Sequence, residues 1–243
     1  MESMWLGSIL SALATGAGAL PVLFMRSATH RFRDILLALT AGIMMAASTF
    51  SLIPQALSES NLRIVTLGIF MGVILLTLIG RVIPHFDLES KMGNKIDKKT
   101  LLIITAITMH NLPEGLSVGV SYADNTDGLG ALIAFAIGLQ NAPEGFLVGL
   151  FLVNQNISRF AAIAIATLTG AVEIVTAFIG FQLTQYVEGL VPYGLSFAAG
   201  AMLYIVYKEL IPESHGDGHE TAATYAFISG LLVMIYLIHW FGG

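Results

Sequence analysis

The chain has 243 residues, of which 56% are hydrophobic and only 11% are charged, and its net charge at pH 7 is −5. Soluble globular domains average about 25% charged residues, so this composition excludes an ordinary soluble domain, and we expect no nucleic-acid partner. The sequence contains no cysteine, which excludes disulfides and thiolate metal ligands.

Eight apolar runs follow one another along the chain, and most reach the roughly 20 residues that span a bilayer as a helix. They occupy about residues 5–25, 35–57, 64–84, 101–123, 128–153, 160–185, 191–211 and 222–241. A membrane β-barrel would instead show alternating segments of about 10 residues. The sequence therefore predicts an all-α integral membrane protein, with eight transmembrane helices in one polytopic domain over 1–243. No basic segment precedes the first run, so no cleavable signal peptide is expected.

Positive charges gather on alternate connectors between these runs. Of the eleven Lys and Arg, only Arg63 lies on one face of the predicted membrane domain. The ten on the other face are Arg26, Arg31, Arg33, Arg81, Lys91, Lys95, Lys98, Lys99, Arg159 and Lys208. The positive-inside rule assigns these ten to the cytoplasm and both termini to the outside. The connector 85–99 then becomes a long cytoplasmic loop.

Two of the predicted helices share a sequence pattern. Residues 41–54 read "AGIMMAASTFSLIP" and residues 199–212 read "AGAMLYIVYKELIP", a spacing of 158 residues. Thr-Gly-Ala likewise occurs at 15–17 and at 169–171. By the charge distribution the related helices run in opposite directions, so spans 1–3 and 6–8 are interpreted as an inverted repeat on either side of spans 4 and 5. Inverted repeats are typical of secondary transporters, whose substrate sites lie near the membrane midplane.

A polar motif occurs twice within apolar sequence, as "HNLPEG" at 110–115 and "QNAPEG" at 140–145. His110 and Glu114 are four residues apart and share a helix face, as do Gln140 and Glu144. Asn111 and Asn141 lie about 100° further round their helices. The proline in each motif is predicted to kink its helix and to free a backbone carbonyl, which needs a polar partner in lipid.

Glu173 adds a third carboxylate in the middle of span 6. An acid at the bilayer centre is expensive and usually marks an ion or substrate path. One divalent cation would reduce the charge of the three acids from −3 to −1, and two would bring it to +1. A single buried acid could be a helix–helix contact, but the duplicated set favours a metal site. Imidazole, amide and carboxylate ligands suit Zn²⁺, Fe²⁺ or Mn²⁺ better than Cu⁺.

The two motifs, followed by "AVEIVTAF" at 171–178, resemble those of the ZIP (Zrt/Irt-like) family of divalent metal transporters, in particular its small bacterial type. The resemblance covers the whole chain. It implies a 3+2+3 helix arrangement and import of Zn²⁺ into the cytoplasm, with Cd²⁺, Fe²⁺ or Mn²⁺ as further substrates. It also implies a homodimer, in a plasma membrane that we expect to be a bacterial inner membrane with periplasmic termini. One or two ions would bind as substrate, without an organic cofactor.

Residue by residue, the resemblance implies a primary metal site and a second one beside it. The residues that match the primary site are His110, Glu114, Gln140 and Glu144. Those that match the second are Asn111, Asn141 and Glu173, with Glu114 and Glu144 bridging the two. Some relatives have aspartate at the position of Asn141, and many others have histidine at that of Gln140. The second site is therefore less anionic here, which puts stable double occupancy in question.

Further candidates lie on spans 2 and 7. Met44 alone would be assigned to core packing, but the resemblance makes it a possible thioether ligand, with Ser51 two turns further on the same face. The stretch "YKELIPESHGDGHE" at 207–220 is acidic and rich in histidine. Its candidates for a cytoplasmic exit path are Glu209, Glu213, His215, Asp217 and His219. The alternative is a solvated loop.

Two other functions compete with transport by a secondary carrier. An intramembrane metal hydrolase of the HExxH type requires a second histidine, whereas here the spacing is His-Asn-x-x-Glu and the second motif has no histidine. A metal sensor or an efflux protein would use the same ligands. The sequence has no P-loop motif, so we expect no ATP-driven transport. Because the hydrolase motif is incomplete, we also expect no enzyme.

Overall fold

The computed structural model describes residues 1–25, 27–82, 98–124, 128–187, 189–216 and 218–242, and within these ranges every regular element is helical. Most of the predicted loop 85–99 and the candidate Asp217 lie outside the described residues. The elements are α1 (Glu2–Ala19), η1 (Leu20–Leu23), α2 (His30–Ala47), η2 (Ser48–Leu52), α3 (Ile53–Ser58), α4 (Leu62–Val82), α5 (Lys98–Ala123), α6 (Leu129–Asn154), α7 (Arg159–Tyr186), α8 (Val191–Ile205), η3 (Val206–Leu210), α9 (Ile211–Ser214) and α10 (Glu220–Gly242).

The fold is that of an all-α membrane protein, as predicted. In the described part of the chain, seven helical segments are long and apolar enough to cross a bilayer. They are Glu2–Leu23, His30–Ser58, Leu62–Arg81, Leu129–Asn154, Arg159–Tyr186, Val191–Ser214 and Glu220–Phe241. The remaining predicted span, 101–123, falls within α5, which has 26 residues. Many large apolar side chains on the outer faces are exposed, which suits a surface in contact with lipid.

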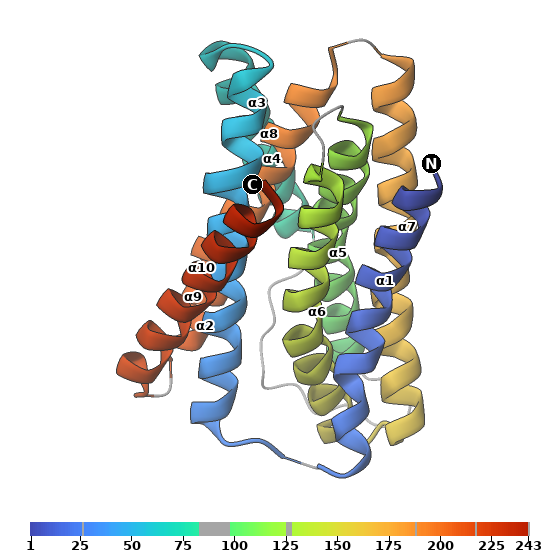
Figure 1. Cartoon of the computed structure of the whole chain (residues 1–243). Coiled ribbons are helices and arrows are strands. Elements are labelled where there is room, and N and C mark those ends of the chain that lie inside the picture. The colour runs from blue at the N-terminus through green and yellow to red at the C-terminus, as the bar shows by residue number, and fades with distance from the viewer. Residues whose placement is uncertain (26, 83–97, 125–127, 188, 217, 243) are drawn as a thin grey trace.

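The helices pack in two sets that meet at α5 and α6. α1 packs on α6 and α7, and α7 packs on α5. On the other side of the bundle α2 packs on α10, and α4 packs on α8 (Figure 1). The contacts of α5 with α8, of α6 with α2, and of α5 with α6 join the two sets. The two helices that carry the repeated polar motif therefore lie at the junction.

Glycines let the paired helices approach until one backbone touches the other. A Cβ added to any of four glycines would overlap a backbone carbonyl oxygen of the neighbouring helix. The pairs are Gly42 with Phe227, Gly200 with Ile69, Gly72 with Phe197, and Gly230 with Leu39. These contacts are related by a shift of 158 residues. The shift converts the Gly42–Phe227 contact into Gly200–Ile69, and it converts Gly72–Phe197 into Gly230–Leu39. Small residues at such contacts are the usual means of helix association in membranes.

Two π-helical turns, which the sequence analysis did not predict, interrupt spans 2 and 7. They are η2 (Ser48–Leu52) and η3 (Val206–Leu210), again 158 residues apart. Each ends with an i to i−5 bond, since the Ile53 amide donates to the Ser48 carbonyl and the Ile211 amide to the Val206 carbonyl. A proline, Pro54 or Pro212, is the second residue after each turn. Because proline has no amide to donate, the ordinary helical bond is lost there, and the wider turn accommodates the ring.

These contacts predict opposite effects for one substitution at two glycines. Gly42→Ala should lower the free energy of unfolding by about 1–3 kcal/mol, because its methyl group collides with the Phe227 carbonyl. Gly138→Ala should leave stability unchanged or raise it by up to about 1 kcal/mol, since alanine favours helix and its Cβ would lie 3.5 Å from the nearest atom, Ser11 Cα. Thermal unfolding in detergent would measure both. Equal midpoints would contradict the close approach of α2 and α10.

Candidate metal centre

α5 and α6 supply the two repeated motifs at the junction of the bundle. Both helices continue without interruption through their prolines, Pro113 and Pro143. The first motif contributes His110, Asn111 and Glu114, and the second contributes Gln140, Asn141 and Glu144. Four of these six, Asn111, Glu114, Gln140 and Asn141, are at most 1% exposed. Polar side chains this deeply buried need partners within the protein.

One pair of these side chains connects the two helices. Gln140 Nε2 donates a hydrogen bond of 2.7 Å to Glu114 Oε1. The second polar atom of each side chain, Glu114 Oε2 or Gln140 Oε1, is buried and has no hydrogen-bond partner among the described residues. Asn141 Oδ1 and Asn111 Nδ2 are likewise buried without a hydrogen-bond partner among the described residues. An unpartnered buried polar atom costs about 1–3 kcal/mol, and a cation would give the three oxygens the partner that they lack.

Glu173 of α7 is satisfied in a different way. Its two carboxylate oxygens accept from Asn141 Nδ2 at 2.8 and 3.0 Å, and Ser11 Oγ of α1 donates to Oε2 at 2.9 Å. Asn141 Nδ2 also lies 3.1 Å from the Ser11 carbonyl oxygen. Ser11 was not among the predicted residues. The only hint in the sequence is that Ser8, Ser11 and Thr15 form a polar stripe on the first apolar helix.

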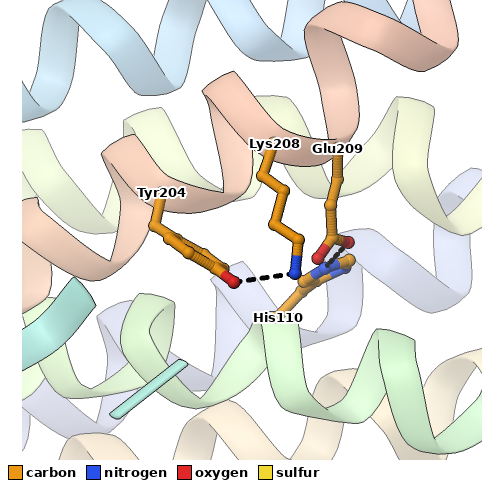
Figure 2. A network of polar contacts seen from close by, with 4 residues as sticks. All are labelled: His110, Tyr204, Lys208 and Glu209. Atoms are coloured by element: carbon orange, nitrogen blue, oxygen red, sulfur yellow. Dashed lines mark hydrogen bonds and ion pairs between the residues drawn. The ribbon is translucent and has the colours of Figure 1, made fainter. Parts of the chain in front are cut away.

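His110 faces away from these amides, toward span 7. Its Nε2 lies 2.6 Å from Glu209 Oε2, so the structure joins a predicted primary ligand to a predicted exit residue. Figure 2 shows the two side chains pointing toward each other from α5 and η3. Lys208, the neighbour of Glu209, donates instead to the Tyr204 hydroxyl at 2.7 Å and lies over its ring. The pair is partly open to solvent, because 24% of the His110 side chain and 38% of that of Glu209 are exposed.

The other candidates are less closely connected. Glu144 is half-buried on α6, Met44 is completely buried on α2, and Ser51 is buried within η2. None of the three forms a side-chain hydrogen bond with Glu114 or Glu173 in the part of the chain that the structure describes. Among all described residues, no group of three His, Asp or Glu side chains lies close enough together to hold a metal ion. Two of the carboxylates are paired with amides of α6 instead.

The described residues after η3 form no side-chain hydrogen bond with the two motifs. Glu213 is exposed on α9. His215 Nδ1 lies 3.0 Å from both the Ile211 carbonyl oxygen and Ser214 Oγ, which ties its ring to the end of span 7. His219 is half-buried just before α10, and Asp217 is outside the described residues. Of the predicted exit residues, Glu209 alone is hydrogen-bonded to a motif residue within the described ranges.

A helical bundle with imidazole, amide and carboxylate groups at its centre is typical of a membrane protein that handles metal ions. A family model described as "ZIP Zinc transporter" matches residues 88–238. The zinc transporter GufA of Myxococcus xanthus is 37% identical over 243 residues, covering 95% of each chain. Zinc transporter ZIPB of Bordetella bronchiseptica is 33% identical over 96% of this chain and 79% of its own. The human zinc transporter ZIP11 is 39% identical over 64% of this chain and 47% of its own.

The chain belongs to the ZIP family of zinc transporters, as the sequence motifs predicted. It is a multi-pass membrane protein and a transporter rather than an enzyme. The alternative of an intramembrane hydrolase finds no support.

The hydrogen bond between α5 and α6 yields a prediction for the metal-free protein. Gln140→Leu removes the donor to Glu114 Oε1 and leaves that buried oxygen without a partner. The free energy of unfolding should fall by about 1–3 kcal/mol. Thermal unfolding with a chelator present would measure this, and Gln185→Leu, at an exposed position of α7, is the matched control. An unchanged midpoint for Gln140→Leu would show that the bond contributes nothing to stability.

Proposed function

We propose that this protein carries a divalent transition-metal ion, with Zn²⁺ as the preferred substrate, across the plasma membrane into the cytoplasm. Cd²⁺, Fe²⁺ and Mn²⁺ are candidate further substrates. The observation that carries the proposal is a set of three buried oxygens that have no hydrogen-bond partner among the described residues: Glu114 Oε2, Gln140 Oε1 and Asn141 Oδ1. They come from two neighbouring helices at the junction of the bundle. A cation that is to cross a membrane needs such oxygens to replace its water.

The proposed ligands are drawn from α5 and α6. Glu114 and Glu144 supply the charge, because one divalent ion neutralises two carboxylates. Gln140 and Asn141 supply neutral oxygens, and His110 supplies a nitrogen once it leaves Glu209. Asn111 and the Met44 thioether are candidates for additional contacts, since both are buried and α2, which carries Met44, packs on α6. Nitrogen and oxygen donors of this kind favour Zn²⁺ over Cu⁺.

The arrangement that we propose around this site is the 3+2+3 bundle with an inverted repeat. Support comes from the reciprocal glycine contacts and from the two π turns, all related by a shift of 158 residues. The distribution of Lys and Arg supports cytoplasmic connectors and termini outside the cell. The expectation of a bacterial inner membrane and of a homodimer comes from the resemblance of the motifs.

Uptake into liposomes tests the assignment. Purified protein would be reconstituted with a fluorescent metal reporter inside the vesicles and Zn²⁺, Cd²⁺, Fe²⁺ or Mn²⁺ outside. Loss of a residue that only hydrogen-bonds a metal ligand typically costs about 10-fold to 100-fold in affinity or activity. Glu114→Gln and Glu144→Gln should each slow Zn²⁺ uptake by more than this, because each removes the charge of a ligand. Glu2→Gln, at an exposed position, is the control and should match the wild type. Normal uptake in both site variants would overturn the proposal.

Glu209 is proposed to receive the ion as it leaves toward the cytoplasm. Metal at the centre and Glu209 compete for His110, so Glu209→Gln should raise the equilibrium affinity for Zn²⁺. A partly exposed ion pair is worth at most about 1 kcal/mol, so the increase should not exceed about fivefold. The maximal rate of uptake should fall, because the ion loses its next acceptor. Glu220→Gln, at an exposed position at the start of α10, is the comparison. A Glu209→Gln variant with an unchanged maximal rate would exclude this role.

A further inference from the structure

Two adjacent amides on α6 are held in the same manner by carboxylates on different helices. Gln140 Nε2 donates to Glu114 of α5, and Asn141 Nδ2 donates to Glu173 of α7. In both cases the amide nitrogen is engaged, and the amide oxygen is left buried without a partner among the described residues. The carboxylate therefore fixes which end of the amide is free. Gln140 and Asn141 each present an oxygen rather than an N–H group.

The two carboxylates differ in what remains free on them. Glu114 uses one oxygen for Gln140 and keeps Oε2 unpartnered in the described structure. Both oxygens of Glu173 already have partners, because Asn141 Nδ2 reaches each of them and Ser11 Oγ donates to Oε2. Glu114 is thus able to bind a cation through an oxygen that has no other partner. A metal bond to Glu173 would compete with short hydrogen bonds in a fully buried place.

We propose that Glu173 and Ser11 are positioning residues that orient Asn141, and that Asn141 binds the transported ion through Oδ1. Glu173 then contacts the amide and not the ion, and the centre holds one divalent ion per chain, neutralised by Glu114 and Glu144. This inference rests on the proposed function. It departs from the sequence-based expectation that Glu173 is itself a ligand of a second ion. Outer groups that hydrogen-bond a ligand in this way commonly fix its orientation and tune the metal site.

Ser11 completes the arrangement from α1. Its hydroxyl donates to Glu173 Oε2, and its carbonyl oxygen lies 3.1 Å from Asn141 Nδ2. The side chain of Asn141 is therefore held between α1 and α7, and a rotation that exchanged its oxygen and nitrogen would direct its carbonyl at Glu173. Oxygen facing carboxylate oxygen in a buried place is strongly disfavoured. The orientation that leaves Oδ1 free is the one that these neighbours impose.

A double-mutant cycle separates a positioning residue from a ligand. The affinity for Cd²⁺ and the number of ions bound would be measured by equilibrium dialysis on purified wild type, Asn141→Ala, Glu173→Ala and the double variant. Each single variant should lose about 10-fold to 100-fold in affinity. The double variant should bind as well as Asn141→Ala, to within about threefold, because Glu173 acts only through Asn141. The wild type should bind one ion per chain.

Two further variants keep the test informative if Glu173→Ala does not fold. Glu173→Gln retains an oxygen that accepts from Asn141 and should keep the wild-type affinity to within about threefold, whereas removal of a ligand charge would cost more. Ser11→Ala should weaken binding, and Ser8→Ala should not. Ser8 is the matched control because it is equally buried on α1 but bonds the Trp5 carbonyl.

The inference is overturned by two bound ions in the wild type, by losses that multiply in the double variant, or by a large loss in Glu173→Gln. The Glu114→Ala variant distinguishes failure of this inference from failure of the proposed transport site. If Glu114→Ala abolishes binding while the Glu173 and Asn141 effects multiply, the transport site stands and Glu173 is a ligand. If the wild type binds no Cd²⁺, or Glu114→Ala binds it normally, the proposed site fails as well.

Discussion

The structure depends on the rule that polar groups buried in a bilayer must find their partners inside the protein. Two carboxylates at the junction of the helix sets, Glu114 and Glu173, are almost completely buried. They are met by amide N–H groups of α6, and His110 is met by Glu209. The amides bring no charge of their own, so they satisfy the acids without neutralising them.

Helix packing follows from the same environment. Lipid tails are as apolar as leucine, so apolar side chains gain little by leaving them, and close backbone contact becomes the main source of association. Glycines provide it at the α2–α10 and α4–α8 contacts, and also next to the centre itself. Gly115 lies against the Glu173 backbone, and Gly145 lies against that of Thr15. These contacts bring α7 and α1 near enough for Glu173 and Ser11 to reach the amides of α6.

Composition and periodicity were sufficient to predict the helical membrane class, because long uncharged apolar runs have few other folds available. The repeated motif was sufficient for the family and for most of the polar residues at the junction. Pairing between side chains was not predictable. The bonds from Asn141 to Ser11 and Glu173 depend on how closely α1, α6 and α7 pack, which involves residues more than 30 positions apart. Ser11 was missed for that reason, since a short polar stripe on an apolar helix does not say which of its members meets another helix.

The π turns alter how a change of chain length would act on this protein. Each closes its hydrogen bond over one residue more than an α-helix does, and proline is the second residue after it. Removing a single residue from Ser48–Leu52 or Val206–Leu210 would restore α geometry and rotate everything beyond it by about 100° relative to the preceding helix. Glu209 lies inside the second of these turns. These five-residue stretches should therefore be fixed in length across the family, although they lie in helices where single substitutions of apolar residues are easily absorbed.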